Sequence, residues 1–197
     1  FDLGCIELVK ISGTTTETVI DGLAEDRSVV LQAKFHNPVA DFIGTFGMPN
    51  LNKLKIILNL SEYKENATIS IKKQDRNGES VPVGMNFVNA AGDFKNDYRF
   101  MTSEIINEKL KAVKFKGVSW NISFEPSMAA IGRLKMQAAA NAEELHFIAK
   151  TENGDLKFMF GDHSTHAGEF VFEPGISGTL KRSWSWPVRQ FIGIMDL

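Results

Sequence analysis

Alternating hydrophobic and polar residues predict β-strands over most of this chain. The clearest segment, SVVLQAKF at residues 28–35, is rich in β-branched and apolar residues. Between two later segments, the pair Asn77-Gly78 favours the tight turn of a β-hairpin. The predicted strands span residues 6–11, 14–20, 28–35, 42–46, 67–73, 81–88, 98–101, 118–124, 144–150, 156–160, 169–173 and 180–186.

Three segments have the apolar spacing of helices instead. Asn50 is a suitable N-cap for a helix over residues 50–59, in which Leu51, Leu54 and Leu58 share one face. A second predicted helix covers residues 127–141 and begins at a serine, and a third begins at residue 188.

The first two helices share a short motif, Leu51-x-Lys53-Leu54-Lys55 and Ile131-x-Arg133-Leu134-Lys135. In each motif the first basic residue lies nearly opposite the apolar stripe, and the second lies at its edge. Each helix follows strands and precedes further strands, so the motif predicts two similar halves. The helix over residues 127–141 has basic residues near its middle among small neighbours, which suits a surface that faces phosphate.

The chain is predicted to have two domains joined by a connector. The first domain covers residues 1–101 and the second covers residues 117–197. Residues 102–116 have weak periodicity and many charges, and predict an exposed connector, with a short helix as the alternative. Both ends of the chain lie in apolar segments, so we expect that part of the first and of the second domain is missing.

The composition is typical of a soluble intracellular protein. A net charge of -2 and a pI near 6.1 do not give the basic character of a general nucleic-acid binder, although a local basic face is compatible with them. The single cysteine, Cys5, excludes an internal disulfide and a cysteine-only zinc site. The sequence has no apolar run of ~20 residues and no leader peptide. We therefore expect a cytoplasmic protein without a membrane partner.

The sequence contains no evident catalytic motif. A glycine-rich phosphate loop, a GxSxG elbow and an HExxH motif are all missing, so we expect no enzymatic activity and no cofactor. The segment Asp162-His163-Ser164-Thr165-His166 contains residue types that bind zinc. It is predicted to be a turn with no further ligands nearby, and we expect a polar turn without metal.

Two other groups of residues have competing interpretations. Trp184 and Trp186 share one face of a predicted strand and could stack on nucleic-acid bases, but a sheet face buried under a helix is favoured. Four lysines form a basic run beside Glu104 and Glu108, which favours a solvated connector over a binding patch. They are Lys109, Lys111, Lys114 and Lys116.

The order of elements resembles that of DNA polymerase sliding clamps. The resemblance is carried by SWNISFEPSMAAIGRLKMQAAANAEELHFIAKTENGDLKFMFGD and by FGMPNLNKLKIILNL, and extends over residues 5–197. It is greatest to T-even-type phage clamps and to the trimeric clamps of the proliferating cell nuclear antigen family. The resemblance implies an α+β sliding-clamp fold with two similar domains, each with antiparallel sheets outside and short helices on one face.

The resemblance also implies partners and functional residues. Three subunits would close head-to-tail into a homotrimeric ring around double-stranded DNA, with the helices lining the ring. The implied DNA-facing residues are Lys53, Lys55, Arg133, Lys135 and Arg189. A peptide from the DNA polymerase or the clamp loader would bind beneath the connector, at Arg27, Ser28, Val29, Ile105, Ile106 and Leu110. A complete clamp would also have a helix before Cys5 and further strands after Leu197.

The leading hypothesis is therefore a DNA replication processivity factor. One alternative is a β-rich phage or viral structural protein, such as a tail or capsid component, in which the basic helices are solvated faces. A second is a small hydrolase that uses His163 and His166.

Overall fold

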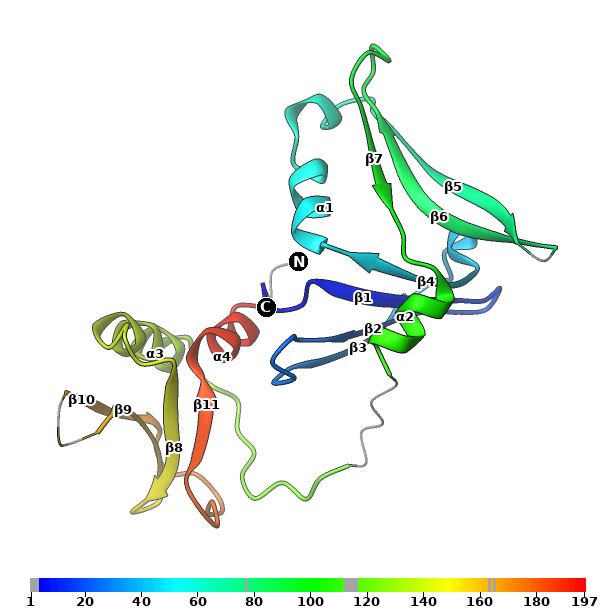
Figure 1. Ribbon diagram of the computed structural model, residues 1–197. Coiled ribbons are helices and arrows are strands. Elements are labelled where there is room, and N and C mark those ends of the chain that lie inside the picture. The colour runs from blue at the N-terminus through cyan, green and yellow to red at the C-terminus, as the bar shows by residue number, and fades with distance from the viewer. Residues whose placement is uncertain (1–3, 77, 112–116, 163, 165) are drawn as a thin grey trace. The chain divides into compact units, whose positions relative to one another are not determined.

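The computed structural model describes residues 4–76, 78–111, 117–162, 164 and 166–197. These residues fold into two compact units (Figure 1). Unit 1 contains the described residues up to 111, and unit 2 contains those from 117 onward. The two units are described separately below.

Unit 1 begins with a four-stranded antiparallel sheet in the order β3-β2-β1-β4. Its strands are β1 (Leu8–Gly13), β2 (Thr18–Leu23), β3 (Val30–Lys34) and β4 (Gly44–Pro49). Alternation along β1 directs Val9 and Ile11 to the core, where their partners on β4 are Met48 and Phe46. A 3-10 helix, η1 (Ala40–Phe42), precedes β4.

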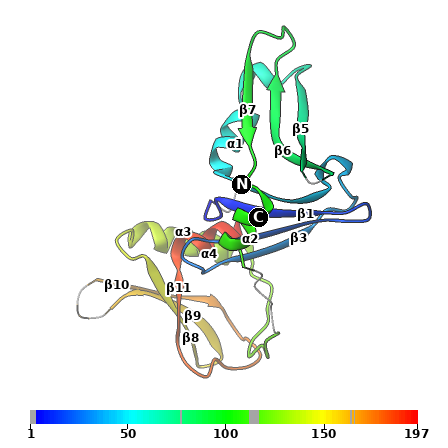
Figure 2. The same cartoon turned by 45° about the vertical axis from the view of Figure 1, so that its right-hand side comes forward.

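A helix and a second sheet complete the core of unit 1. Helix α1 (Leu51–Leu58) follows β4, and Asn50 caps it as predicted, accepting a hydrogen bond from the Lys53 backbone N–H at 3.2 Å. After the short η2 (Ser61–Tyr63) come β5 (Thr68–Arg76), β6 (Glu79–Val88) and β7 (Lys95–Arg99), in the order β5-β6-β7. In both views α1 lies beside β7 (Figures 1 and 2).

The second sheet supplies buried side chains to the same core as α1 and the first sheet. Phe87 of β6 and Tyr98 of β7 pack with Leu54 and with Phe46 in one cluster. The Tyr98 hydroxyl donates a hydrogen bond to the carbonyl oxygen of Pro49, and burial raises the pKa of Tyr98. Unit 1 is therefore a two-sheet structure with a helix packed into the shared core.

Helix α2 (Ser103–Lys109) occupies the segment predicted as an exposed connector. Its Ile106 side chain is fully buried against Gly47 of β4. The two residues are so close that a Cβ atom added at Gly47 would lie only 2.8 Å from Ile106 Cδ1. The predicted exposure is therefore wrong at this residue, and the alternative of a short helix is confirmed. Ile106 is the one buried residue of α2. A single buried position gives no repeating apolar pattern, so sequence periodicity did not predict that this residue is buried.

Unit 2 contains one four-stranded antiparallel sheet and two helices. Helix α3 (Met128–Ala140) begins at the predicted N-cap Ser127, whose Oγ accepts from the Ala130 N–H at 3.1 Å. The other elements are β8 (His146–Glu152), β9 (Asp155–Gly161), β10 (Ala167–Glu173), β11 (Trp184–Pro187) and α4 (Val188–Met195). The sheet order is β10-β9-β8-β11, and the core is rich in phenylalanine, including Phe147, Phe158 and Phe160.

The two units contain the same structural repeat. The order β3-β2-β1-β4 in unit 1 matches β10-β9-β8-β11 in unit 2, and each last strand is followed by an eight-residue helix, α1 or α4. The counterpart of α1 is therefore α4. The predicted equivalence of α1 and α3 is wrong, because α3 precedes its sheet whereas α1 follows its own. The shared motif is the combination of apolar and basic residues that is typical of amphipathic basic helices.

One predicted strand is missing from unit 2. Residues 118–124 alternate apolar and polar side chains, but they form neither a strand nor a helix. Strand β11 is also shorter than the predicted 180–186, since pairing with β8 begins only at Trp184. No helix in the described parts of the chain is long and apolar enough to cross a bilayer.

Candidate functional site

Helix α1 presents two lysines beside its buried face. Leu51, Leu54 and Ile57 point into the core, whereas Leu58 is 42% exposed, so Ile57 replaces the predicted Leu58 on the buried face. Lys53 is exposed and Lys55 is half-buried. Both are at the margins of the buried stripe, because each is about 100° from its centre at 3.6 residues per turn.

The two basic residues of α3 are engaged within unit 2. The Arg133 Nη1 donates a hydrogen bond to the carbonyl oxygen of Val171 on β10 at 3.2 Å, and its guanidinium carbon lies 5.3 Å from the centre of the Phe170 ring. The Lys135 ammonium forms an ion pair with Asp196, directly after α4. Both side chains remain exposed, so they can still reach solvent.

Helices α3 and α4 lie next to each other (Figure 1). Arg189 is exposed on α4 and adds a fifth basic residue to the helices. Together α1, α3 and α4 carry five basic residues and no acidic residue, although the chain has 24 Asp and Glu residues against 22 Lys and Arg residues. The surfaces of α1, α3 and α4 are therefore basic within an acidic protein, whereas α2 carries Glu104 and Glu108 beside Lys109.

The opposite face of the unit 2 sheet has balanced charges. Lys150 Nζ lies 2.9 Å from Glu169 Oε2, and Lys157 Nζ lies 2.7 Å from Glu152 Oε2. These lysines hold the pKa values of both glutamates below their usual range, through a hydrogen bond from Lys157 to Glu152 and from Lys150 to Glu169. Positive charge on this face is neutralised by adjacent carboxylates.

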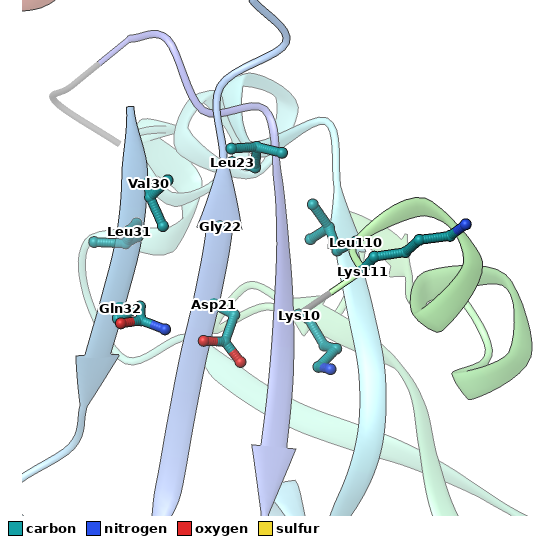
Figure 3. Close-up of a pocket in the computed structure, with 9 residues that line it drawn as sticks. All are labelled: Lys10, Asp21, Gly22, Leu23, Val30, Leu31, Gln32, Leu110 and Lys111. Atoms are coloured by element: carbon teal, nitrogen blue, oxygen red, sulfur yellow. The ribbon is translucent and has the colours of Figure 1, made fainter. Parts of the chain in front are cut away.

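A second candidate site lies on unit 1, where the end of α2 meets strands β1, β2 and β3 (Figure 3). The side chains of Leu23, Val30 and Leu110 gather there, beside Lys111 and a polar row across the three strands. That row consists of Lys10, Asp21 and Gln32, which the sheet register places opposite one another. The enclosed space is ≈ 20 Å³, about enough for one water molecule. A larger ligand would therefore lie on this surface instead of entering it.

The predicted peptide-binding residues are only partly brought together. Leu110 lines the same small cavity as Leu23 on β2 and as Val30 and Leu31, the two residues directly after the predicted 27–29. Ile106 is fully buried in unit 1, Ile105 is 46% exposed, and Val29 packs against the core. Arg27 and Ser28 lie in the turn before β3, where Arg27 has a φ of 60° and the Ser28 hydroxyl donates to Asp26. Lys10, Asp21 and Gln32 were missed, because their proximity follows from strand register.

Three further features were singled out in the sequence: the tryptophan pair of the last strand, the histidine-containing turn and the single cysteine. Trp184 and Trp186 are 41% and 44% exposed, so the prediction of a buried sheet face is wrong for them. His163 lies outside the described residues, and the described residues contain no group of three or more metal-binding side chains. Cys5 is half-buried with a free thiol.

Comparison with solved structures relates this arrangement to sliding clamps. The chain is similar to PCNA from Thermococcus kodakaraensis, with a TM-score of 0.54 and 12% identity over 98% of this chain and 76% of that one. It is also similar to the H. pylori β clamp solved in complex with diflunisal, with a TM-score of 0.52 and 13% identity. That match covers 97% of this chain, which spans about half (49%) of the H. pylori chain.

At the level of sequence, no family model matches the chain. No curated protein matches it either. The structural similarity extends over nearly the whole chain and shows that it has the sliding-clamp fold. The predicted α+β fold with two similar domains is thereby confirmed.

Proposed function

We propose that this protein is a subunit of a DNA sliding clamp, a non-catalytic processivity factor that encircles duplex DNA and tethers a DNA polymerase. The observation that carries the proposal is the distribution of charge over a clamp fold. Five basic residues and no acidic residue lie on α1, α3 and α4, while the whole chain has a net charge of -2. Basic helices on an acidic protein suit a surface that faces phosphate.

The small number of basic residues on the helices fits a clamp that moves along DNA. Contacts from lysine and arginine to phosphate are independent of sequence and weaken steeply with salt. Lys135 and Arg133 also have intramolecular partners, so each must exchange a contact in order to bind phosphate. Weak, exchangeable contacts allow sliding, and retention on DNA then depends on the closed ring.

Ring closure requires contacts between copies, and two edge strands can supply them. Over the described residues, β7 and β10 each pair with one neighbouring strand and leave their other edge open. An antiparallel pairing between β7 of one copy and β10 of the next would bring Lys95 opposite Glu173 and Arg99 opposite Glu169. Since β7 and β10 belong to different units, this pairing is head-to-tail and can close a homotrimer.

The surface around Leu23, Val30 and Leu110 is the candidate docking site for partner peptides. Its apolar centre and its flanking Lys10, Asp21 and Lys111 suit a short peptide with an apolar anchor and polar neighbours. The peptide would come from the DNA polymerase and, during assembly on DNA, from a clamp loader. Such a protein would act in the cytoplasm of a cell that replicates DNA, without a cofactor.

A retention assay on circular and linear DNA tests the proposal. Protein is loaded onto nicked circular duplex DNA, the DNA is isolated by gel filtration, and half of the sample is linearised by a restriction enzyme. A clamp remains on circles and runs off the linear molecules. Equal retention on both forms contradicts the proposal, and a protein that binds neither form but assembles into larger particles favours the structural-protein alternative.

A further inference from the structure

A polar cleft of ≈ 320 Å³ lies within unit 1, where the chain passes from β7 into α2. Its walls come from β4, from the adjoining ends of β5 and β6, and from the residues between β7 and α2. Four charged residues line it, namely Arg76, Glu79, Arg99 and Glu104. Its volume lies at the lower end of the about 300–1,000 Å³ that is typical of ligand sites. It shares none of its described lining residues with the surface around Leu110.

One wall of the cleft is a strand edge that has no neighbour. The Phe100 N–H donates a hydrogen bond to the carbonyl oxygen of Val83 on β6, and the chain then crosses to β4, where Met101 pairs with Gly47. Residues 79–82 at the start of β6 therefore pair with β5 alone. No other described segment forms backbone hydrogen bonds with them. An open strand edge of this kind can accept a further strand through its backbone groups.

The two arginines of the cleft form no ion pair with a carboxylate in the described part of the chain. The Arg76 Nη2 donates one long hydrogen bond, of 3.4 Å, to Gln74 Oε1. Glu104 is engaged elsewhere, because hydrogen bonds from the Thr102 hydroxyl and from its own backbone N–H hold the pKa of its carboxyl below its usual range. The Arg76 guanidinium can therefore receive an acidic ligand.

Apolar side chains form the rest of the lining. The Phe46 and Phe100 rings stack with 4.5 Å between their centres, and Val81 and Val83 of β6 line the cleft with them. A ligand in the cleft would thus meet an apolar surface beside a positive charge and an open backbone edge. A bound peptide strand uses all three, since its main chain pairs with the edge while its side chains contact the surroundings.

We propose that this cleft binds an extended segment of a partner protein that carries an acidic side chain between apolar ones. The segment adds to the edge of β6 at residues 79–81, since Pro82 has no N–H to donate, and its carboxylate meets Arg76. Glu79, which lies opposite Arg76 across the β5–β6 hairpin, disfavours a continuous run of acidic residues. The cleft is a second docking site, separate from the surface around Leu110, and it depends neither on DNA binding nor on ring closure.

Backbone amide chemical shifts, followed by NMR while synthetic peptides are added, test the proposal. The probes are pools of end-capped hexapeptides with a fixed central residue and varied valine, leucine and threonine neighbours. With glutamate at the centre, we expect shifts at residues 79–81 and 102–104. Binding should be at least about tenfold tighter than with glutamine, which cannot form the charged hydrogen bond to Arg76. N-methylation of the peptide backbone should abolish binding, because it removes the donors that pair with β6.

Arg76→Glu is expected to weaken binding of the glutamate pool at least about tenfold and to leave the melting temperature unchanged, since Arg76 is exposed. Arg99 is kept in all variants, because it faces the next copy in the proposed ring. Lys10→Glu, at a residue that lines the surface around Leu110, is the matched control and should leave binding unchanged.

Three results overturn the proposal. The first is a glutamate pool that causes no shifts at residues 79–81. The second is binding that shifts the amides of Leu23, Val30 and Leu110 and is lost in Lys10→Glu, which assigns the peptide to that surface. The third is binding of sodium acetate as tight as that of the peptides, which shows an anion site without strand pairing.

Discussion

Lys53 and Arg133 differ in how far their charges are engaged within the chain. The Lys53 side chain is exposed and has no hydrogen-bond or ion-pair partner in the part of the chain that the structure describes. Arg133 donates a hydrogen bond to Val171 and lies over the Phe170 ring. A phosphate group would therefore meet an available charge at Lys53, but it would compete with two internal contacts at Arg133.

Lys53→Gln is expected to shorten retention on circular DNA without changing the melting temperature. One lost phosphate contact lowers the slope of log affinity against log salt by about 0.9, while an exposed helical position tolerates glutamine. Binding measured across a salt series gives the slope. Lys34→Gln on β3 is the control, since Lys34 already pairs with Glu17 at 2.8 Å. Equal slopes for Lys53→Gln and the parent protein contradict a DNA contact at this residue.

Ile106 packs into the core of unit 1 although it lies in a charged segment of the sequence. It is fully buried against Gly47, so Ile106→Ala removes core contacts and leaves a cavity. We expect a loss of about 2–5 kcal/mol in the free energy of unfolding, measured by urea denaturation. Ile105→Ala, one residue away and 46% exposed, is the control and should lose much less. Equal losses at the two positions would show that α2 does not pack on β4.

At the level of elements, the sequence predicted the helices well because their signals are local. Asn50 and Ser127 both act as caps, and α1, α3 and α4 begin where the pattern places them. Strand pairing is not local, which explains the failure at residues 118–124. Their alternation is correct for a strand, but none of the described strands pairs with them.

The ion pair between Lys135 and Asp196 connects α3 with the end of α4. Asp196→Asn is expected to strengthen DNA retention, because it leaves the Lys135 charge unpaired on the basic face. Stability should change by less than about 1 kcal/mol, since both side chains are nearly half exposed. Retention on circular DNA and a thermal melt measure the two effects, with Asp155→Asn on β9 as the control. Weaker retention would indicate that the pair holds Lys135 in its DNA-binding position.

At the scale of the whole molecule, the repeated topology explains more than the sequence motif did. The match between Leu51–Lys55 and Ile131–Lys135 predicted two similar halves, and the strand order of the two sheets does repeat, although the two matched helices are not equivalent. Its correct alignment pairs α1 with α4, which could be found only from the order of strands in each sheet. The polar row of Lys10, Asp21 and Gln32 likewise depends on register between three strands. Sequence periodicity identifies faces, whereas register decides which residues meet.

Head-to-tail assembly through β7 and β10 leads to a charge-reversal prediction. In the proposed pairing Lys95 of one copy faces Glu173 of the next, so Lys95→Glu or Glu173→Lys places like charges opposite each other. A cross-strand pair changes from attraction to repulsion, which costs about 1–2 kcal/mol per interface. We therefore expect each single variant to associate about tenfold more weakly than the parent protein in sedimentation at low salt.

The double variant carrying Lys95→Glu and Glu173→Lys should associate as strongly as the parent, because the pair is restored with its signs exchanged. Restoration separates a direct contact from an effect of net charge, since the double variant and the parent have the same total charge. Lys181→Glu, at an exposed residue outside both strands, is the control for net charge. If the double variant is weaker than either single variant, Lys95 and Glu173 do not face each other, and another pair of edges must close the ring.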